Sequence, residues 1–147
     1  MKKVLSMILS LILVVSLFPM GAVNLIANAE MEDTDGYYTY TVTNGEAMVI
    51  SVDDTISGKV TIPSTLGGFP VTSIDDRAFE LCESLTSITI PNSVKSIGVY
   101  AFCGCESLTS VNIPDSVTSI GEYAFEYCEN LESINLPDSA IDIGWNA

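Results

Sequence analysis

Residues 84–106 read SLTSITIPNSVKSIGVYAFCGCE, and residues 107–129 read SLTSVNIPDSVTSIGEYAFEYCE. The second stretch follows the first without a gap, and 16 of their 23 positions are identical. A further copy opens at Asn130 and stops at Ala147, one residue before its phenylalanine, so we expect a fragment of a longer protein. A period of about 20–50 residues is typical of solenoids and propellers, so the repeat by itself predicts the architecture.

Each repeat combines one short strand with a turn. Alternation places Ile88 and Ile90 on one face of the strand, with Ser87 and Thr89 on the other. A proline then closes the strand, because proline cannot donate the next ladder bond. The corner glycines, where we expect a positive φ, are Gly98, Gly121 and Gly144. A single coil cannot bury its apolar face, so equivalent coils are predicted to stack, strand beside strand.

The unit resembles the BspA-like (bacterial surface) leucine-rich repeats, whose pattern is roughly L-x-x-I-x-I-P-x-x-V-x-x-I-G-x-x-A-F-x-x-C. Residues 84–129 fit this pattern at every motif position, and the match extends over about 59–147. The resemblance implies a right-handed, mostly β solenoid on a secreted or surface-exposed bacterial protein that serves adhesion or other protein binding. The predicted coils are 59–83, 84–106, 107–129 and an incomplete 130–147.

The first 29 residues read as a secretory signal peptide. Lys2 and Lys3 form a basic start, residues 4–18 are mostly apolar, and Ala27-Asn28-Ala29 is a cleavage site of the A-x-A type. The alternative is a membrane anchor, but a spanning helix needs about 20 apolar residues. We therefore expect a secreted or cell-surface protein that starts at Glu30, with no membrane span after cleavage.

Two segments separate the signal peptide from the repeats. Residues 30–36 (EMEDTDG) are acidic and aperiodic, which indicates a flexible linker. In the second segment, 37–58, residues 37–52 alternate on both sides of Asn44-Gly45, which predicts a hairpin with a type I′ turn and strands at 38–43 and 47–52. We expect this hairpin to cap the first coil. That coil carries five extra residues around 66–70, a predicted side bulge, and Asp75 replaces its corner glycine.

The net charge excludes several partner classes. The chain has 19 acidic and 5 basic residues and a net charge of −14, and two of the five basic residues belong to the signal peptide. Nucleic acids and anionic lipids need clustered Lys and Arg, so neither is an expected partner. The acidic surface is compatible with a basic partner or loosely held cations, but we interpret it as a feature that favours solubility.

Catalytic and metal-binding patterns are weak. The sequence contains no histidine, which excludes Ser-His-Asp and Cys-His catalysis and histidine metal sites. Asp53-Asp54 and Asp75-Asp76 are carboxylate pairs, but adjacent side chains of an extended chain point apart, so we interpret them as solvated turn residues. We expect no enzyme activity, no metal and no cofactor.

The four cysteines allow two interpretations. An even number in a secreted chain indicates disulfides, whereas identical positions in successive coils indicate a buried column of reduced thiols, which we favour. The predicted core columns are Cys82, Cys105 and Cys128, and Phe79, Phe102 and Phe125. Cys103 takes the place of Glu80 and Glu126, so we expect it to point outward.

The function favoured by these observations is non-catalytic binding of an extracellular protein or a glycan. The candidate ligand-facing residues are the outward strand positions Ser87, Thr89, Ser110, Asn112, Ser133 and Asn135. Two alternatives remain open: an accessory repeat domain of a longer secreted hydrolase, and a structural spacer.

Overall fold

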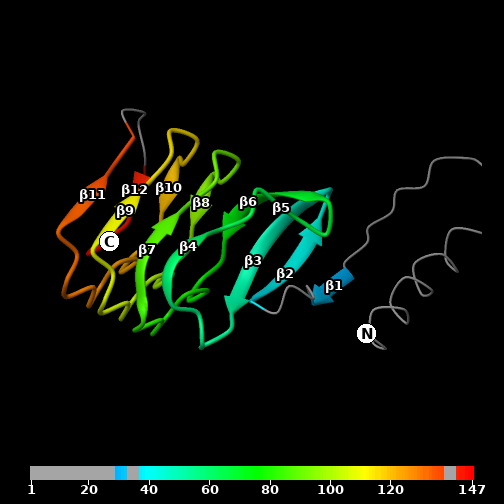
Figure 1. The fold of residues 1–147 in the computed structure, drawn as a ribbon. Helices are drawn as coiled ribbons and strands as arrows, with labels where there is room; N and C mark the ends of the chain where they lie inside the picture. The colour runs from blue at the N-terminus through cyan, green and yellow to red at the C-terminus, as the bar shows by residue number, and fades with distance from the viewer. Residues whose placement is uncertain (1–28, 33–36, 138–141) are drawn as a thin grey trace, which may run out of the picture.

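The computed structural model describes residues 29–32, 37–137 and 142–147 (Figure 1). The predicted signal peptide lies outside these residues, except for Ala29. The strands are β1 (Ala29–Glu32), β2 (Tyr38–Thr43), β3 (Glu46–Val52), β4 (Gly58–Thr61), β5 (Thr65–Leu66), β6 (Phe69–Ile74), β7 (Leu85–Thr89), β8 (Ser96–Ile97), β9 (Ser110–Asn112), β10 (Ser119–Ile120), β11 (Ser133–Asn135) and β12 (Asp142–Ile143). Over the described ranges there is no helix long and apolar enough to cross a membrane.

The strands form two sheets along the stack of coils. Sheet A has the order β1-β2-β3-β6-β8-β10-β12, with β5 paired to β6, and sheet B has the order β11-β9-β7-β4. Neighbouring coils pair in parallel at the repeat spacing, so Ile88 pairs with Val111 and Ile97 with Ile120. Each coil thus contributes one strand to each sheet, as Figure 1 shows for β7 and β8. The prediction of a mostly β repeat solenoid is confirmed.

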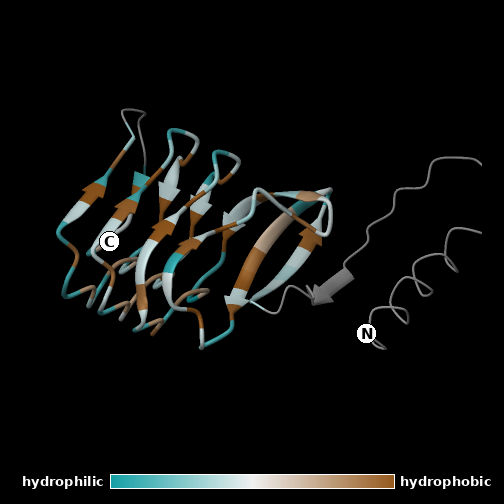
Figure 2. Ribbon diagram, viewed as in Figure 1, coloured by the Kyte–Doolittle hydropathy of each residue, from teal (hydrophilic) through white to brown (hydrophobic). Residues whose placement is uncertain are grey.

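The core lies between the two sheets and repeats from coil to coil. Phe79, Phe102 and Phe125 form one stacked column, with ring centroids 4.9 and 5.3 Å apart. Leu85 and Leu108 are fully buried in equivalent positions. In Figure 2 the apolar segments recur along β7, β9 and β11. Stacking therefore buries side chains that an isolated coil would leave in water.

The N-terminal hairpin continues sheet A. Asn44 and Gly45 have φ values of 55° and 82°, as a type I′ turn requires, and β3 pairs in parallel with β6 of the first coil. Apolar residues of the hairpin join the core: Tyr40, Val42, Ala47 and Val49. The linker prediction is wrong for residues 30–32, which belong to β1 and pair with β2. Residues 33–36 lie outside the described part of the chain.

The extra residues of the first coil form a second, smaller hairpin instead of a loose bulge. Thr65 pairs with Pro70 and Leu66 with Phe69 across Gly67-Gly68, whose φ values are 57° and 86°. Leu66 is buried, and a Cβ at Gly67 would lie 2.5 Å from the Tyr40 hydroxyl. This insertion therefore packs on β2 and helps to close the N-terminal end of the core.

The corner glycines are required for a different reason than the one predicted. None of Gly98, Gly121 and Gly144 has a positive φ. A Cβ at Gly98 would lie 2.5 Å from the backbone of Asp75 and Asp76, and one at Gly121 would lie 2.5 Å from the Val99 nitrogen. Each corner is in contact with the backbone of the coil before it. Left-handed residues do occur two positions later, where φ is 60° at Arg77 and 57° at Tyr100 and Tyr123.

Candidate functional site

The outward side chains of sheet B form two columns. Register places Ser87, Ser110 and Ser133 side by side, and likewise Thr89, Asn112 and Asn135. All six line one shallow hollow of about 350 Å³ together with Ile88, Val111 and Ile134. The structure thus brings the six sequence-predicted residues together on one surface, which we call the sheet B face.

Two further residues belong to the same columns. Lys59 pairs with Ser87 and Thr61 with Thr89, so β4 adds a fourth member to each column. The sequence contained the signal for them, since Val60 and Ile62 align with Ile88 and Ile90. Lys59 and Thr61 are the residues on the other face of the same short strand.

The sheet B face differs in charge from the turns of the chain. Its eight column residues include one cation, Lys59, and no carboxylate, although the chain carries 19 acidic residues. In the described part of the chain the only ion pair joins Arg77 to Glu80 at 2.8 Å, so the Lys59 ammonium has no ionic partner. Asn135 Nδ2 donates a hydrogen bond to Asn112 Oδ1 at 3.0 Å, which joins the two amide side chains of this column. The face thus offers hydroxyl and amide groups with little net charge.

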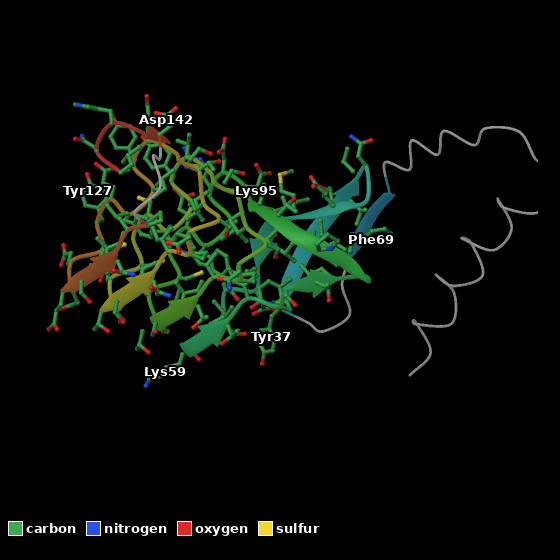
Figure 3. The ribbon with its side chains drawn as sticks, turned by 90° about the horizontal axis from the view of Figure 1, so that it is seen from above. Tyr37, Lys59, Phe69, Lys95, Tyr127 and Asp142 are labelled. Atoms are coloured by element: carbon green, nitrogen blue, oxygen red, sulfur yellow. The ribbon has the colours of Figure 1, made fainter. Side chains whose placement is uncertain are left out.

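A larger cleft of about 550 Å³ adjoins this face between the hairpin and the first coil. Its lining residues are Tyr37, Tyr38, Thr55, Ile56, Ser57, Lys59, Val60, Thr61 and Pro63. Tyr37 is 53% exposed, and Figure 3 shows Tyr37 and Lys59 directed to the same side of the molecule. The Tyr38 hydroxyl donates a hydrogen bond to the Thr61 carbonyl oxygen at 3.4 Å, and burial raises the pKa of Tyr38 to about 12. Tyr38 is therefore a neutral donor at physiological pH.

A cation and aromatic rings form a third column outside the core. The Tyr100 and Tyr123 rings stack with centroids 4.9 Å apart, and the Arg77 guanidinium lies 4.7 Å from the Tyr100 centroid. The Trp145 ring meets Tyr123 edge-on at 5.5 Å. Because the rings of Tyr100 and Tyr123 cover each other, a ligand would find mainly their edges.

The in-phase cysteines are buried and reduced. Cys105 Sγ donates to the Phe79 carbonyl oxygen at 3.2 Å, and Cys128 Sγ donates to that of Phe102 at the same distance. Burial raises the pKa of the Cys82 thiol to about 11, while the hydrogen bond with Cys128 and burial raise that of Cys105 well above its usual range. Protonated thiols are poor nucleophiles and poor metal ligands. The hydrogen bond with Cys105 lowers the pKa of Cys128, but its thiol is buried and bonded to a core carbonyl oxygen, so we interpret the column as structural.

Cys103 is buried, which its predicted outward position did not suggest, although it does not belong to the cluster of buried core residues. Its side chain is only 7% exposed. Glu80 and Glu126 occupy its position in the flanking coils, and their charges act on the thiol, so we attribute its burial to these two longer side chains. Burial and the negative charges of Glu126 and Glu80 raise the pKa of Cys103.

The carboxylate pairs stabilise turns. Asp53 accepts a hydrogen bond from the Thr55 N–H at 2.8 Å and another from the Thr55 hydroxyl, and these bonds lower the pKa of Asp53. Asp76 Oδ1 accepts a bond from the Val99 N–H of the next coil at 2.7 Å. Across the described ranges no three His, Cys, Asp or Glu residues are grouped to hold a metal.

The chain is similar to a family of bacterial repeats and to solved structures of leucine-rich repeat proteins. The model of the BspA type leucine-rich repeat region (6 copies) matches residues 58–147. A leucine-rich repeat protein of Treponema pallidum superposes with a TM-score of 0.70 at 31% identity, covering 78% of this chain and 54% of that one. One from Bacteroides ovatus gives a TM-score of 0.67 at 37% identity, covering 74% and 30%. The chain thus spans about half, or less, of these proteins. No curated protein matches it.

Proposed function

Because this chain belongs to the BspA-type leucine-rich repeat family, we propose that it is a non-catalytic protein that binds an extracellular partner through the sheet B face. We place it outside the bacterial cell or on the cell surface. The resemblance in the repeats and the signal-like sequence of residues 1–29 support this location. The repeats of this family generally mediate protein interaction, so a protein partner, as in adhesion, takes precedence over a glycan.

The observation that carries the proposal is the charge pattern of sheet B. Carboxylates are absent from its eight column residues, whereas acidic residues occur throughout the turns. Solubility alone would favour acidic residues on an exposed sheet as well. A surface kept free of them on a rigid parallel sheet suits a neutral or mildly acidic partner that accepts and donates hydrogen bonds. This pattern also makes a strongly basic partner a poor fit for the face.

Affinity capture by the purified chain from residue 30 onward, against extracellular host and bacterial proteins, tests the proposal. The triple variant Thr89→Ala, Asn112→Ala, Asn135→Ala should lose the captured partner but stay folded, because the positions are exposed and the side-chain hydrogen bond that it removes, from Asn135 to Asn112, contributes about 0.5–1.5 kcal/mol. The matched control is Tyr100→Asn with Tyr123→Asn, since asparagine tolerates the left-handed backbone there. Loss of binding in the control but not in the triple variant would move the site to the tyrosine column. Hydrolysis of a peptide or glycan by the wild-type chain would overturn the non-catalytic assignment.

A further inference from the structure

The two sheets end at different places on the N-terminal side. Sheet A runs past the first coil into β3, β2 and β1, whereas sheet B ends at β4. The hairpin therefore covers the core without pairing to β4, and one edge of β4 stays open. The cleft of about 550 Å³ lies at this step and includes Lys59, Val60 and Thr61 of β4 in its lining. Its volume falls within the range of about 300–1,000 Å³ that is typical of ligand sites.

The backbone of β4 presents hydrogen-bonding groups to the cleft. The Ile62 N–H donates to the Thr89 carbonyl oxygen at 3.0 Å, so Ile62 faces β7. Backbone groups of successive strand residues point to opposite sides, which turns those of Lys59 and Thr61 away from β7. The Tyr38 hydroxyl bond to the Thr61 carbonyl oxygen confirms this direction. In the described structure β4 pairs with β7 alone, and no turn or side-chain hydrogen bond reaches the Lys59 N–H or C=O or the Thr61 N–H.

An open edge of this kind is a template for another strand. Proteins protect such edges with proline, charges or a bulge, or they use them to capture an extended peptide. Here the edge carries one exposed charge, the unpaired Lys59 ammonium, on a chain whose net charge is −14. The exposed Tyr37 ring and the hydroxyls of Thr55 and Ser57 line the same cleft. These groups suit a peptide that places a carboxylate beside Lys59.

We propose that β4 captures an extended peptide segment of a partner protein, which adds as a strand to the open edge of sheet B and directs an acidic side chain to Lys59. The Lys59 N–H and C=O and the Thr61 N–H bind its backbone. The proposal rests on the proposed binding function but uses the edge of sheet B instead of its face. A partner could thus run from the edge onto the face through Lys59 and Thr61, which belong to both surfaces.

A displayed library of linear eight-residue peptides, selected on the purified chain from residue 30 onward, tests this proposal. We expect selected peptides that lack proline, alternate β-branched residues and carry an Asp or Glu. Thr61→Pro removes the N–H at the edge of β4. It should weaken binding of the selected peptide about tenfold or more, since one backbone hydrogen bond is lost and the proline ring disturbs the packing of the peptide against β4. The substitution fits the backbone, because Val60, the residue before it, lies in a strand, and proline favours an extended conformation in the preceding residue. Thr61→Val keeps the N–H and should bind like the wild type. Lys59→Gln should weaken binding about two- to fivefold.

Amide hydrogen exchange identifies the edge directly. The Lys59 and Thr61 amides should exchange fast in the free chain and at least about tenfold more slowly with the peptide bound. A ligand held only by the side chains of the face would not protect them. Selection of Lys- or Arg-rich peptides, equal binding by Thr61→Pro, or unchanged exchange at both amides would overturn the proposal. A homodimer by light scattering that Thr61→Pro abolishes would also overturn it, because a second copy would then be the occupant.

Discussion

Replacing Gly121 by alanine tests how the coils are held together. The new Cβ would lie 2.5 Å from the Val99 nitrogen and 2.6 Å from the Gly98 carbonyl carbon. Ordinary contacts begin at 3.4 Å, so two backbones must separate by about 0.9 Å. Two hydrogen bonds cross this junction at 2.8 Å, from the Gly121 N–H to the Ile97 carbonyl and from the Thr118 N–H to the Lys95 carbonyl. Separation at the corner strains both bonds at once.

The expected cost follows from these contacts. Overpacking typically costs about 1–3 kcal/mol, and each weakened hydrogen bond about 0.5–1.5 kcal/mol. We therefore expect Gly121→Ala to lower the free energy of unfolding by about 2–6 kcal/mol. Urea unfolding followed by far-UV circular dichroism measures this as a shift of the midpoint with little change in slope. Asp75→Ala is the matched control, because Asp75 already carries a Cβ at the equivalent corner and stacks on β3. It should stay within about 0.5 kcal/mol of the wild type.

A second substitution at the same position separates steric contact from backbone conformation. Asparagine tolerates a positive φ better than other residues do, so Gly121→Asn would be milder than Gly121→Ala if the corner needed that conformation. Contact with the preceding coil predicts that asparagine is at least as harmful as alanine. A Gly121→Asn variant near wild-type stability, or a Gly121→Ala variant within about 0.5 kcal/mol, would refute the reasoning.

Two further predictions concern the thiols. A thiol reagent should label none of Cys82, Cys103, Cys105 and Cys128 in the native chain and all four after denaturation, because all are buried and free; native labelling of Cys103 would contradict its burial. Stability should decline from pH 9 toward pH 11, because the pKa of Cys82 rises from 9.0 to about 11 on folding and the unfolded chain loses the proton first. Thermal unfolding against pH measures the decline, which should be shallower in Cys82→Ala; an unchanged slope would assign the effect to other groups.

The sequence was sufficient for the features that recur with the period. Residues that are 23 positions apart pair across neighbouring coils. The register of the strands, which normally depends on contacts far apart in the sequence, could therefore be predicted by aligning the chain with itself. This is why the six candidate residues of sheet B could be named as one surface. The hairpin strands β2 and β3 could also be predicted, because Asn44-Gly45 and the alternation on both sides of it are local signals.

Other features were decided by the tertiary structure, because they depend on what lies in the adjoining coil. The sequence places Cys103 on an outward position, but it is buried, which we attribute to longer side chains on both sides. It also marks Gly121 as special, but the reason is the distance between two backbones. Finally, the sequence predicts a cap without showing that the cap pairs with sheet A alone and leaves β4 open. The period determines which residues are equivalent, whereas close packing between coils determines what each residue contacts.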